Sequence, residues 1–498
     1  MEINLLPHQV DHVQNVCNIL QKTHVAFDMS LMGSGKTYTT VEVAKRLQFN
    51  HIVVVCPATI ESKWRDMAKY GVNIYKVISY QSLRSRKGCK PSHGLLNRVD
   101  NEDGTTVFTP TDTMKKLTSE GTLFVFDEAQ NIKNKNDQWH ACKAITYHIL
   151  QSGGLSRFIL LSGTPIDKEE HAINIMNMIG FIRHHMLFNY RKEEGILRLY
   201  GAKELLDFCS FVNKEHTDKF LLTHRFTKDT VRHNCYLLFQ QVLKTHITSS
   251  MPPPKLKVDM DCKNGYFNIA DEEDKIKLKQ GIAALHNASA FNEISGTAAV
   301  SAENMGSITK ALMKIEEAKI NTFVRIGLKQ IKDVPSSKIG IFVHYNASLQ
   351  KLEEAFKEYN PIVLQGKIPK EKRQALIDQY QKPDLTHRVL ISNLQVCATG
   401  VDLDDKYGEF PRFAYASPNY VILNLQQLIY RFRRSDSKSS AVFRFVYGKG
   451  DHKEMSILNA LARKSDVMKT TLEYQVESGI TFPGDYTDEV EAENEDLE

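Results

Sequence analysis

The chain is 498 residues long, with 42% hydrophobic and 25% charged side chains and a formal net charge of +5 at pH 7. The length predicts about two to four domains, the ordinary composition excludes a globally disordered protein, and so small a charge permits a polyanionic partner without requiring one. The eight cysteines include no C-x-x-C pair, and no apolar run of about 18 residues occurs. These absences exclude a zinc ribbon, a disulfide framework and a membrane span, and predict a soluble intracellular protein of the nucleus or the cytoplasm.

Residues 1–180 alternate short apolar runs with helical patterns. HIVVVCP from His51, TLFVFDE from Thr122 and RFILLSGTP from Arg157 are apolar almost throughout and rich in β-branched and aromatic residues. Strands that are buried on both faces of a parallel sheet have this composition. Residues 1–180 are therefore predicted to form an α/β lobe.

The strongest motif of this lobe is MSLMGSGKT at 29–37, which lies between the strand-like VAFD and the helical VEVAKRL. A glycine-rich loop in this place points backbone N–H groups at phosphates, with Lys36 reaching the β- and γ-phosphates and Thr37 binding Mg²⁺. The general P-loop pattern has glycine at the position of Ser30, but the narrower helicase form fits. The residues predicted to bind ATP here are Met32, Gly33, Ser34, Gly35, Lys36 and Thr37.

Two further motifs follow buried strands. Asp127 and Glu128 come directly after TLFVF, where a P-loop ATPase holds its metal and its attacking water; an acidic helix cap is the alternative interpretation. SGTP at 162–165 ends the third strand. It is either a capped turn or a loop that senses the γ-phosphate and contacts nucleic acid through Thr164.

Helical periodicity dominates residues 181–335, which we interpret as a helical subdomain and linker broken by MPPPK at 251–255. Residues 336–470 are predicted to form a second α/β lobe. Its strand-like runs are KIGIFVHY from Lys338, HRVLISN from His387, NYVILN from Asn419 and SAVFRFVYG from Ser440. Residues 471–498 end in an acidic stretch and are predicted to be disordered.

The second lobe carries a basic cluster. QQLIYRFRRSDSK at 426–438 predicts a helix with Gln427, Arg431 and Arg434 on nearly one side. Paired guanidinium groups beside a nucleotide can stabilise charge on the γ-phosphate, although a solvated basic face has the same pattern. The preceding ISNLQVCATGVDLDD at 391–405 favours a nucleotide site, with Gly400 and Asp402 at its rim.

Taken in order, these motifs resemble those of superfamily 2 helicases from residue 5 to about residue 450. Within that superfamily the chain is most similar to Swi/Snf-type ATPases, which are mostly double-stranded DNA translocases. The segments that carry the resemblance are LLPHQ (5–9), GSGKT (33–37), PATIESKW (57–64), DEAQNIKN (127–134), SGTP (162–165), HRFTKDTV (224–231), PPPKLKV (252–258), LQGKIPKEKRQALIDQY (364–380), ATGVDL (398–403) and QLIYRFRR (427–434).

The resemblance implies two RecA-like parallel-sheet lobes with a helical insertion between them, and hydrolysis of ATP with Mg²⁺ at the cleft between the lobes. Gln9 would read the adenine, Thr37 and Asp127 would hold Mg²⁺, and Glu128 would orient the water. Arg431 and Arg434 would act on the γ-phosphate. The nucleic-acid contacts would come from Lys63, Ser79, Tyr80, Thr164 and Thr399, whereas Trp64 is assigned to core packing.

The chain also departs from the Swi/Snf pattern. Gln130 stands where that group usually has histidine, and RRSDSK replaces its R-x-G-Q ending. No targeting module is recognisable, and so compact a chain resembles helicase-like proteins of large DNA viruses. If the protein is viral, a location in the virion is an alternative to the nucleus or the cytoplasm. Three functions are compatible with the motifs: a translocase on duplex DNA, which we favour, a strand-separating DNA or RNA helicase, and an ATP-dependent switch or scaffold independent of nucleic acid.

Overall fold

A computed structural model of the chain describes residues 2–89, 91–182, 190–193, 196–227, 229–253, 257–258, 260–295, 302–398, 401–434, 436–471 and 489–491. The chain divides into two compact units. Unit 1 comprises Met1–Pro254 and Val467–Gly479, and unit 2 comprises Lys255–Asp466 and Ile480–Glu498. The stretch predicted as a helical subdomain is therefore shared between the units. No helix among the described residues is long and apolar enough to cross a membrane.

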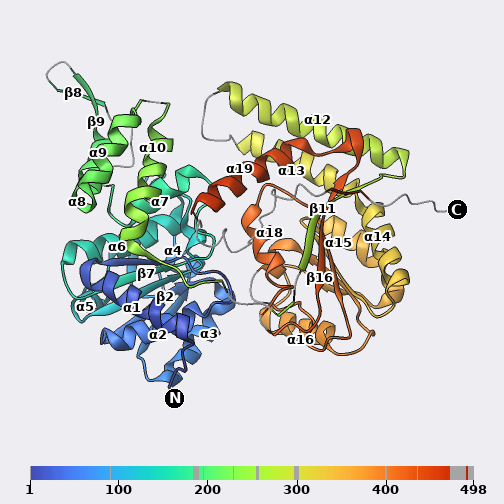
Figure 1. Ribbon diagram of the computed structural model, residues 1–498, viewed down its shortest axis with the longest axis horizontal. Helices are drawn as coiled ribbons and strands as arrows, with labels where there is room; N and C mark the ends of the chain where they lie inside the picture. The colour runs from blue at the N-terminus through green and yellow to red at the C-terminus, as the bar shows by residue number, and fades with distance from the viewer. Residues whose placement is uncertain are drawn as a thin grey trace. The chain divides into compact units, whose positions relative to one another are not determined.

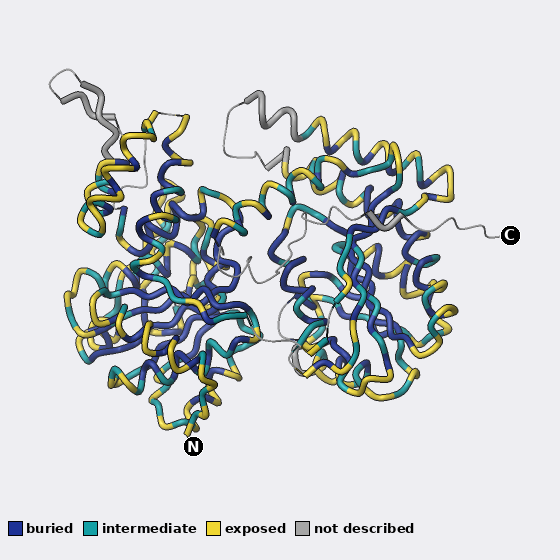
Figure 2. The backbone as a smooth tube through the Cα atoms, in the orientation of Figure 1, coloured by how far each residue is buried: buried dark blue, intermediate teal, exposed yellow. Residues whose placement is uncertain are grey.

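Unit 1 is built on a six-stranded sheet of order β10-β1-β7-β6-β2-β3, in which each pair of neighbours is parallel (Figure 1). The strands predicted from His51, Thr122 and Arg157 lie at its centre, and their burial is visible in Figure 2. The six strands are β1 (Val25–Asp28), β2 (His51–Cys56), β3 (Ile74–Ser79), β6 (Thr122–Asp127), β7 (Arg157–Leu161) and β10 (Thr248–Ser249).

Helices on one face of this sheet enclose its core. In α1 (Pro7–Lys22), Val13, Val16, Cys17 and Leu20 are buried at the spacing of a single helix face and pack on alternate strand residues. Helix α2 (Lys36–Arg46) contributes further apolar side chains to the same cluster. Because α1 and α2 flank the loop at 29–35, this packing holds both sides of the glycine-rich motif.

The rest of unit 1 is mostly helical. Strands β4 (Leu96–Asp100) and β5 (Thr106–Pro110) form an antiparallel pair, as do β8 (Tyr190–Glu193) and β9 (Ile196–Leu199). The remaining helices of this part of the chain are α3 (Glu61–Arg65), α4 (Tyr80–Arg84), α5 (Asp112–Ser119), α6 (Asp137–Ser152), α7 (Glu169–Met178), α8 (Tyr200–Val212), α9 (Lys214–Thr223), α10 (Val231–Leu238) and α11 (Lys244–Ile247).

Unit 2 contains a seven-stranded parallel sheet of order β13-β14-β12-β15-β16-β11-β17. Its strands are β11 (Met260–Phe267), β12 (Lys338–Val343), β13 (Ile362–Leu364), β14 (Val389–Asn393), β15 (Arg412–Ala416), β16 (Ala441–Gly448) and β17 (Glu489–Glu491). Its helices are α12 (Glu272–Ser295), α13 (Ala302–Glu317), α14 (Ile320–Asp333), α15 (Asn346–Ala355), α16 (Lys370–Gln381), α17 (Leu394–Ala398), α18 (Ile422–Ile429) and most of α19 (Met455–Thr471). The two parallel sheets with their helices confirm the predicted α/β fold class.

Two local predictions are wrong. The run from Asn419 is not a strand: the strand is β15, and residues 422–429 form α18, whose buried residues are mostly apolar but include Gln426 and Gln427. The predicted helix at 426–438 ends at Ile429, so Arg431 and Arg434 do not lie on a helix face. Beyond Ile429 the Arg431 carbonyl accepts the N–H of Leu403 at 2.9 Å instead of a partner within a helix, and the Phe432 ring packs edge-on against neighbouring rings of the unit 2 core.

Four of the described strands lie inside the stretch predicted as helical: β8 and β9 pair with each other, β10 joins the sheet of unit 1 and β11 joins that of unit 2. Most of the predicted disordered tail, 471–498, lies outside the described residues, except for residue 471 and for 489–491, which form β17 beside β11.

A buried histidine makes unit 1 sensitive to acid. His93 is 5% exposed, and its Nδ1 accepts the backbone N–H of Leu95. Burial, aided by Lys76, lowers the pKa of His93 to about 4. The unfolded chain therefore binds more protons than the folded chain between pH 6.5 and 4, and stability falls as the pH is lowered through that range.

Between pH 6.5 and 4 the native chain should lose unfolding free energy because His93 becomes protonated on unfolding. His93→Gln lacks this group, so we expect its loss over the same range to be smaller by about 2 kcal/mol. Urea denaturation of both proteins at about pH 7 and about pH 4.5 measures the difference. Parallel losses in the two proteins would exclude His93 as the acid-sensitive group.

Candidate ATP-binding site

The glycine-rich loop connects the carboxyl end of β1 to the first turn of α2. Gly33 and Gly35 have φ of 82° and 93°, which favour glycine over any residue with a Cβ. A Cβ on Gly35 would lie 2.4 Å from Nε2 of Gln9, so the second glycine also admits the Gln9 side chain. The loop thus presents its backbone N–H groups beside the positive end of α2, as a phosphate site requires.

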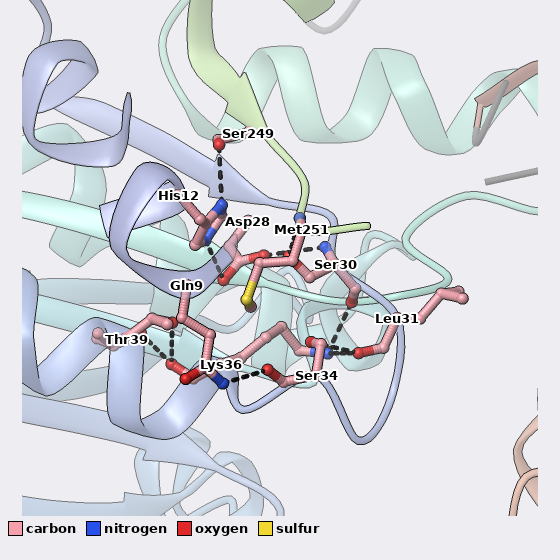
Figure 3. A network of polar contacts seen from close by, with 11 residues as sticks. Gln9, His12, Asp28, Ser30, Leu31, Ser34, Lys36, Thr39, Ser249 and Met251 are labelled. Carbon is pink, nitrogen blue, oxygen red and sulfur yellow. Dashed lines mark hydrogen bonds and ion pairs between the residues drawn. The ribbon is translucent and has the colours of Figure 1, made fainter. Parts of the chain in front are cut away.

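Lys36 lies inside the curve of this loop. Its Nζ donates to the carbonyl oxygens of Ser30 at 2.8 Å and Leu31 at 3.1 Å (Figure 3). These carbonyls hold the ammonium group within the loop that it is predicted to serve. A phosphate that enters the loop would therefore meet a lysine that is already in place.

Gln9 reaches the same loop from α1. Its Nε2 donates to the Ser34 carbonyl at 2.9 Å, and its Oε1 accepts the Leu6 N–H at 2.9 Å. The side chain is buried. Helix α1 is thereby fastened to the phosphate-binding loop 25 residues further along the chain, and the structure brings Gln9 together with residues 33–37.

Asp127 ends β6 and is held at three points. Trp64 donates its indole N–H to Oδ2 at 2.8 Å, and the Glu128 N–H donates to Oδ1 at 2.9 Å. Tyr80 donates its hydroxyl to the Asp127 backbone carbonyl at 2.9 Å. Burial, with the charge of Glu128, raises the pKa of Asp127 to about 6, although Trp64 and two lysines oppose the rise. A carboxyl group in such surroundings gains from a nearby cation.

Glu128 follows in a left-handed conformation with φ of 56°. A chain of side-chain hydrogen bonds begins here: Gln130 Nε2 donates to Glu128 Oε2 at 2.5 Å, and Ser162 Oγ donates to Gln130 Oε1 at 2.6 Å. Ser162 Oγ also accepts the Thr164 N–H at 3.1 Å. The amide of Gln130 therefore joins the acidic pair to the loop at 162–165, because it can donate and accept at once.

The loop at 162–165 also packs directly on the phosphate-binding loop. A Cβ on Gly163 would lie 3.0 Å from the Ser30 carbonyl oxygen and 3.1 Å from the Leu31 Cα, both backbone atoms. Glycine at 163 favours this approach, because a Cβ there would be in tighter than ordinary contact with the backbone. The sequence motifs at 29–37, 127–130 and 162–165 thus form one contiguous site at the carboxyl ends of β1, β6 and β7.

Parts of the chain are similar to known proteins. Residues 2–167, which include all three, match the family model ResIII, described as "Type III restriction enzyme, res subunit". An Acanthamoeba polyphaga mimivirus protein named "Putative ATP-dependent RNA helicase L364" is 23% identical over 491 residues, 92% of this chain and 82% of that protein. The Arabidopsis thaliana "SNF2 domain-containing protein CLASSY 4" is 21% identical over 432 residues, 74% of this chain and 35% of that protein.

Residues 2–167 are thus similar to a restriction-enzyme subunit family, and most of the chain is similar to a viral protein named as an ATP-dependent helicase. These similarities agree with the predicted helicase-like enzyme that hydrolyses ATP as a nucleic-acid-dependent motor, and the SNF2 domain-containing relative agrees with the Swi/Snf-like resemblance. The mimivirus relative agrees with the likeness to viral helicase-like proteins. Among solved structures, "Sulfolobus solfataricus SWI2/SNF2 ATPase core in complex with dsDNA" is similar, at 16% identity, 95% coverage of this chain, 96% of that chain and a TM-score of 0.32.

The candidate arginines and the other nucleotide-site candidates from the second lobe lie in unit 2. Arg431 is buried and donates from Nε and Nη2 to the Ala398 carbonyl at 3.0 and 2.8 Å. Arg434 forms an ion pair with Asp402 at 2.7 Å. These contacts bring both arginines to the segment around 398–402, as the sequence predicts. Gln427 is buried within α18, and Gly400 and Thr399 lie outside the described residues.

The proposed nucleic-acid contacts in unit 1 have different environments. Lys63 is exposed. Ser79, Tyr80 and Thr164 are buried, and Ser79 caps α4 by accepting the Ser82 N–H. Buried groups with partners inside the unit are suited to positioning the loops around Asp127.

Trp64 is fully buried, which confirms its assignment to core packing. Its second role, the hydrogen bond to Asp127, was not predicted from the sequence, and neither was the bridging role of Gln130. No local pattern could have signalled the Trp64 bond, because Asp127 lies 63 residues further along the chain.

The Trp64 bond has a measurable consequence. Trp64→Phe keeps the ring in the core but removes the N–H that holds the Asp127 carboxylate. We expect kcat for ATP hydrolysis to fall about tenfold, because a hydrogen bond to a charged group is lost. The acid limb of the pH–rate profile should also move to higher pH, since Trp64 lowers the pKa of Asp127.

Trp139→Phe is the matched control. Trp139 is buried and donates its indole N–H to the Asn174 carbonyl at 3.2 Å, away from the acidic pair. The substitution should cost stability without moving the pH–rate profile. Equal profiles for the native chain and Trp64→Phe would show that the indole only fills space.

Proposed function

We propose that the chain moves along duplex DNA by using ATP hydrolysis, as a translocase that does not separate the strands. The observation that carries the proposal is the contiguous site in unit 1. Hydrogen bonds tie Gln9 and Lys36 to the phosphate-binding loop and tie the acidic pair to the loop at 162–165, which packs on the phosphate-binding loop. The Swi/Snf-like order of the motifs supports duplex DNA as the track, because that group consists mostly of double-stranded DNA translocases.

In this proposal the side chains of unit 1 divide the chemistry. Lys36 leaves the carbonyls of Ser30 and Leu31 for the β- and γ-phosphates, and the loop N–H groups bind the phosphate oxygens. Glu128 orients the attacking water, and Gln130 fixes the Glu128 carboxylate. Gln9 lies where it would read the adenine.

Thr37 and Asp127 are the proposed holders of Mg²⁺. A hydroxyl and a carboxylate are oxygen donors of the kind Mg²⁺ takes, and the raised pKa of Asp127 marks a carboxyl group that a cation would stabilise in its charged form. When bound, the cation would neutralise charge on the phosphates. Arg431 and Arg434 of unit 2 are the further groups proposed to act on the γ-phosphate.

Lys63 and Thr399 remain the proposed direct contacts to the nucleic-acid backbone. Ser79, Tyr80 and Thr164 are proposed to act through the loops that they hold. Contacts to phosphates imply weak sequence preference and binding that weakens steeply with salt.

A strand-separating helicase is the second candidate, because the mimivirus relative is named as an RNA helicase. Steady-state ATP hydrolysis with duplex DNA, single-stranded DNA and RNA added in parallel separates the two. Strongest stimulation by duplex DNA, without strand displacement, supports the translocase. Strongest stimulation by single strands or RNA supports the helicase, and indifference to every nucleic acid would overturn both.

A further inference from the structure

A buried ion pair lies beneath the phosphate-binding loop. His12 Nε2 and Asp28 Oδ2 are 3.0 Å apart, and the two side chains are each 2% exposed. Burial by itself would raise the pKa of Asp28, yet His12, Lys36 and Ser30 hold it below its ordinary value. Neither residue belongs to the proposed chemistry, so the cost of burying them calls for another role.

Asp28 acts on Ser30, whose polar groups are all engaged (Figure 3). The Ser30 N–H donates to Asp28 Oδ1 at 2.9 Å, and the Ser30 carbonyl accepts from Lys36 at 2.8 Å. Its hydroxyl oxygen accepts the backbone N–H of Met251 at 2.8 Å. Ser30 is 0% exposed, so water cannot replace any of these partners. One residue thus connects the P-loop lysine to a segment 221 residues away.

That segment is tied to the loop at two further points. Strand β10 adds to the edge of the sheet beside β1, and the Met29 N–H donates to the Ser249 carbonyl at 3.0 Å. Ser249 Oγ lies 2.9 Å from His12 Nδ1, which closes the path from the ion pair to the strand. Pro252 and Pro253 follow, with φ restricted by their rings, and the first of the two segments that make up unit 1 ends at Pro254.

We propose that Ser30 is a positioning residue that couples Lys36 to residues 248–251, the segment through which the chain leaves unit 1. When Lys36 turns from the Ser30 carbonyl to a phosphate, Ser30 loses one of its three restraints and its bond to Met251 loosens. The stiff prolines then carry the change along the chain. Asp28, which is held by His12, keeps its bond to the Ser30 N–H. The movement of Ser30 that follows the loss of Lys36 therefore acts on its hydroxyl bond to Met251. This coupling rests on the proposed ATP site and extends it.

Amide hydrogen exchange on the full chain, with and without a non-hydrolysable ATP analogue, tests the coupling. Residues 29–37 should become protected, while the peptide containing Met251 should exchange at least about threefold faster with nucleotide. In Ser30→Ala the Met251 N–H has lost its acceptor, so its exchange should be fast and insensitive to nucleotide. In Ser249→Ala the nucleotide response should shrink, because the segment is released from His12.

Ser156→Ala is the matched control. Ser156 is also 0% exposed and bridges two backbone groups, the Thr122 N–H and the Thr118 carbonyl, near the amino end of β6. It should lower stability and leave the nucleotide response at 248–251 intact. Ser30→Ala should in addition lower the ratio of stimulated to basal kcat by about three- to tenfold, with a smaller change in KM.

The outcomes separate the coupling from the function on which it rests. Protection at 29–37 with no nucleotide response at 248–251 in the native chain overturns the coupling alone. The coupling is also overturned if Ser30→Ala behaves like Ser156→Ala. A native chain that shows no protection at 29–37 overturns the proposed ATP site itself, and the coupling with it.

Discussion

Lys36→Ala is expected to lower nucleic-acid-stimulated ATP hydrolysis by about 10²–10³-fold. Removing one preorganised charged donor from a phosphate site has an effect of this order, because the neutral N–H groups of the loop cannot supply its charge. The Lys36 ammonium bonds carbonyls of its own loop, so its loss should leave the fold of unit 1 in place. Steady-state hydrolysis with saturating nucleic acid measures the effect.

Lys45→Ala is the matched control, since Lys45 lies in the last turn of the same helix, α2, away from the loop. It should retain hydrolysis within about twofold, because a partly exposed helix-terminal charge contributes little. Comparable losses in both variants would trace the effect to the helix. Full activity in Lys36→Ala would remove the loop at 29–37 from the reaction.

Glu128→Gln should lower the rate of ATP hydrolysis by about 10²–10³-fold, as much as Lys36→Ala, while ATP still binds. The substitution removes the carboxylate that orients water but preserves the shape of the side chain and an oxygen that can accept from Gln130. The expected product is a chain that retains unhydrolysed ATP. Single-turnover hydrolysis and nucleotide retention, measured on the same sample, distinguish lost chemistry from lost binding.

Glu120→Gln provides the same isosteric change just before β6, whereas Glu128 comes directly after that strand. Glu120 bonds to His51 at 3.1 Å and is partly exposed, so its loss should cost little stability and no hydrolysis. Hydrolysis within about threefold of native in Glu128→Gln would require another residue to orient the water.

The central strands and the three ATP-site motifs could be predicted from the sequence because their signals are local. Strands buried on both faces read as unbroken apolar runs, and the loop at 29–37 must combine glycines with lysine to bind phosphate. The order of the motifs then indicated a resemblance to superfamily 2 helicases, and residues 2–167 match the family model described as "Type III restriction enzyme, res subunit".

Other structural features could not be predicted from the sequence, because the residues that cause them are distant in the chain. The helix predicted at 426–438 ends at Ile429, and beyond it the Arg431 carbonyl accepts the N–H of Leu403, a contact that helical spacing does not reveal. Strand β10 has only two residues, and its place beside β1 depends on the edge that β1 leaves open. Neither the end of this helix nor the place of β10 can be recognised in a short window of neighbouring residues.

The sequence by itself determined which residues could bind phosphate, since residue type and short spacing suffice for that chemistry. Only the tertiary structure decided how they are held: Trp64 on Asp127, Gln130 between two loops, and Ser30 between Lys36 and Met251. The physical reason is that a buried polar group must find a hydrogen-bond partner, and the partner is whichever group the fold brings within reach, however far away in the chain.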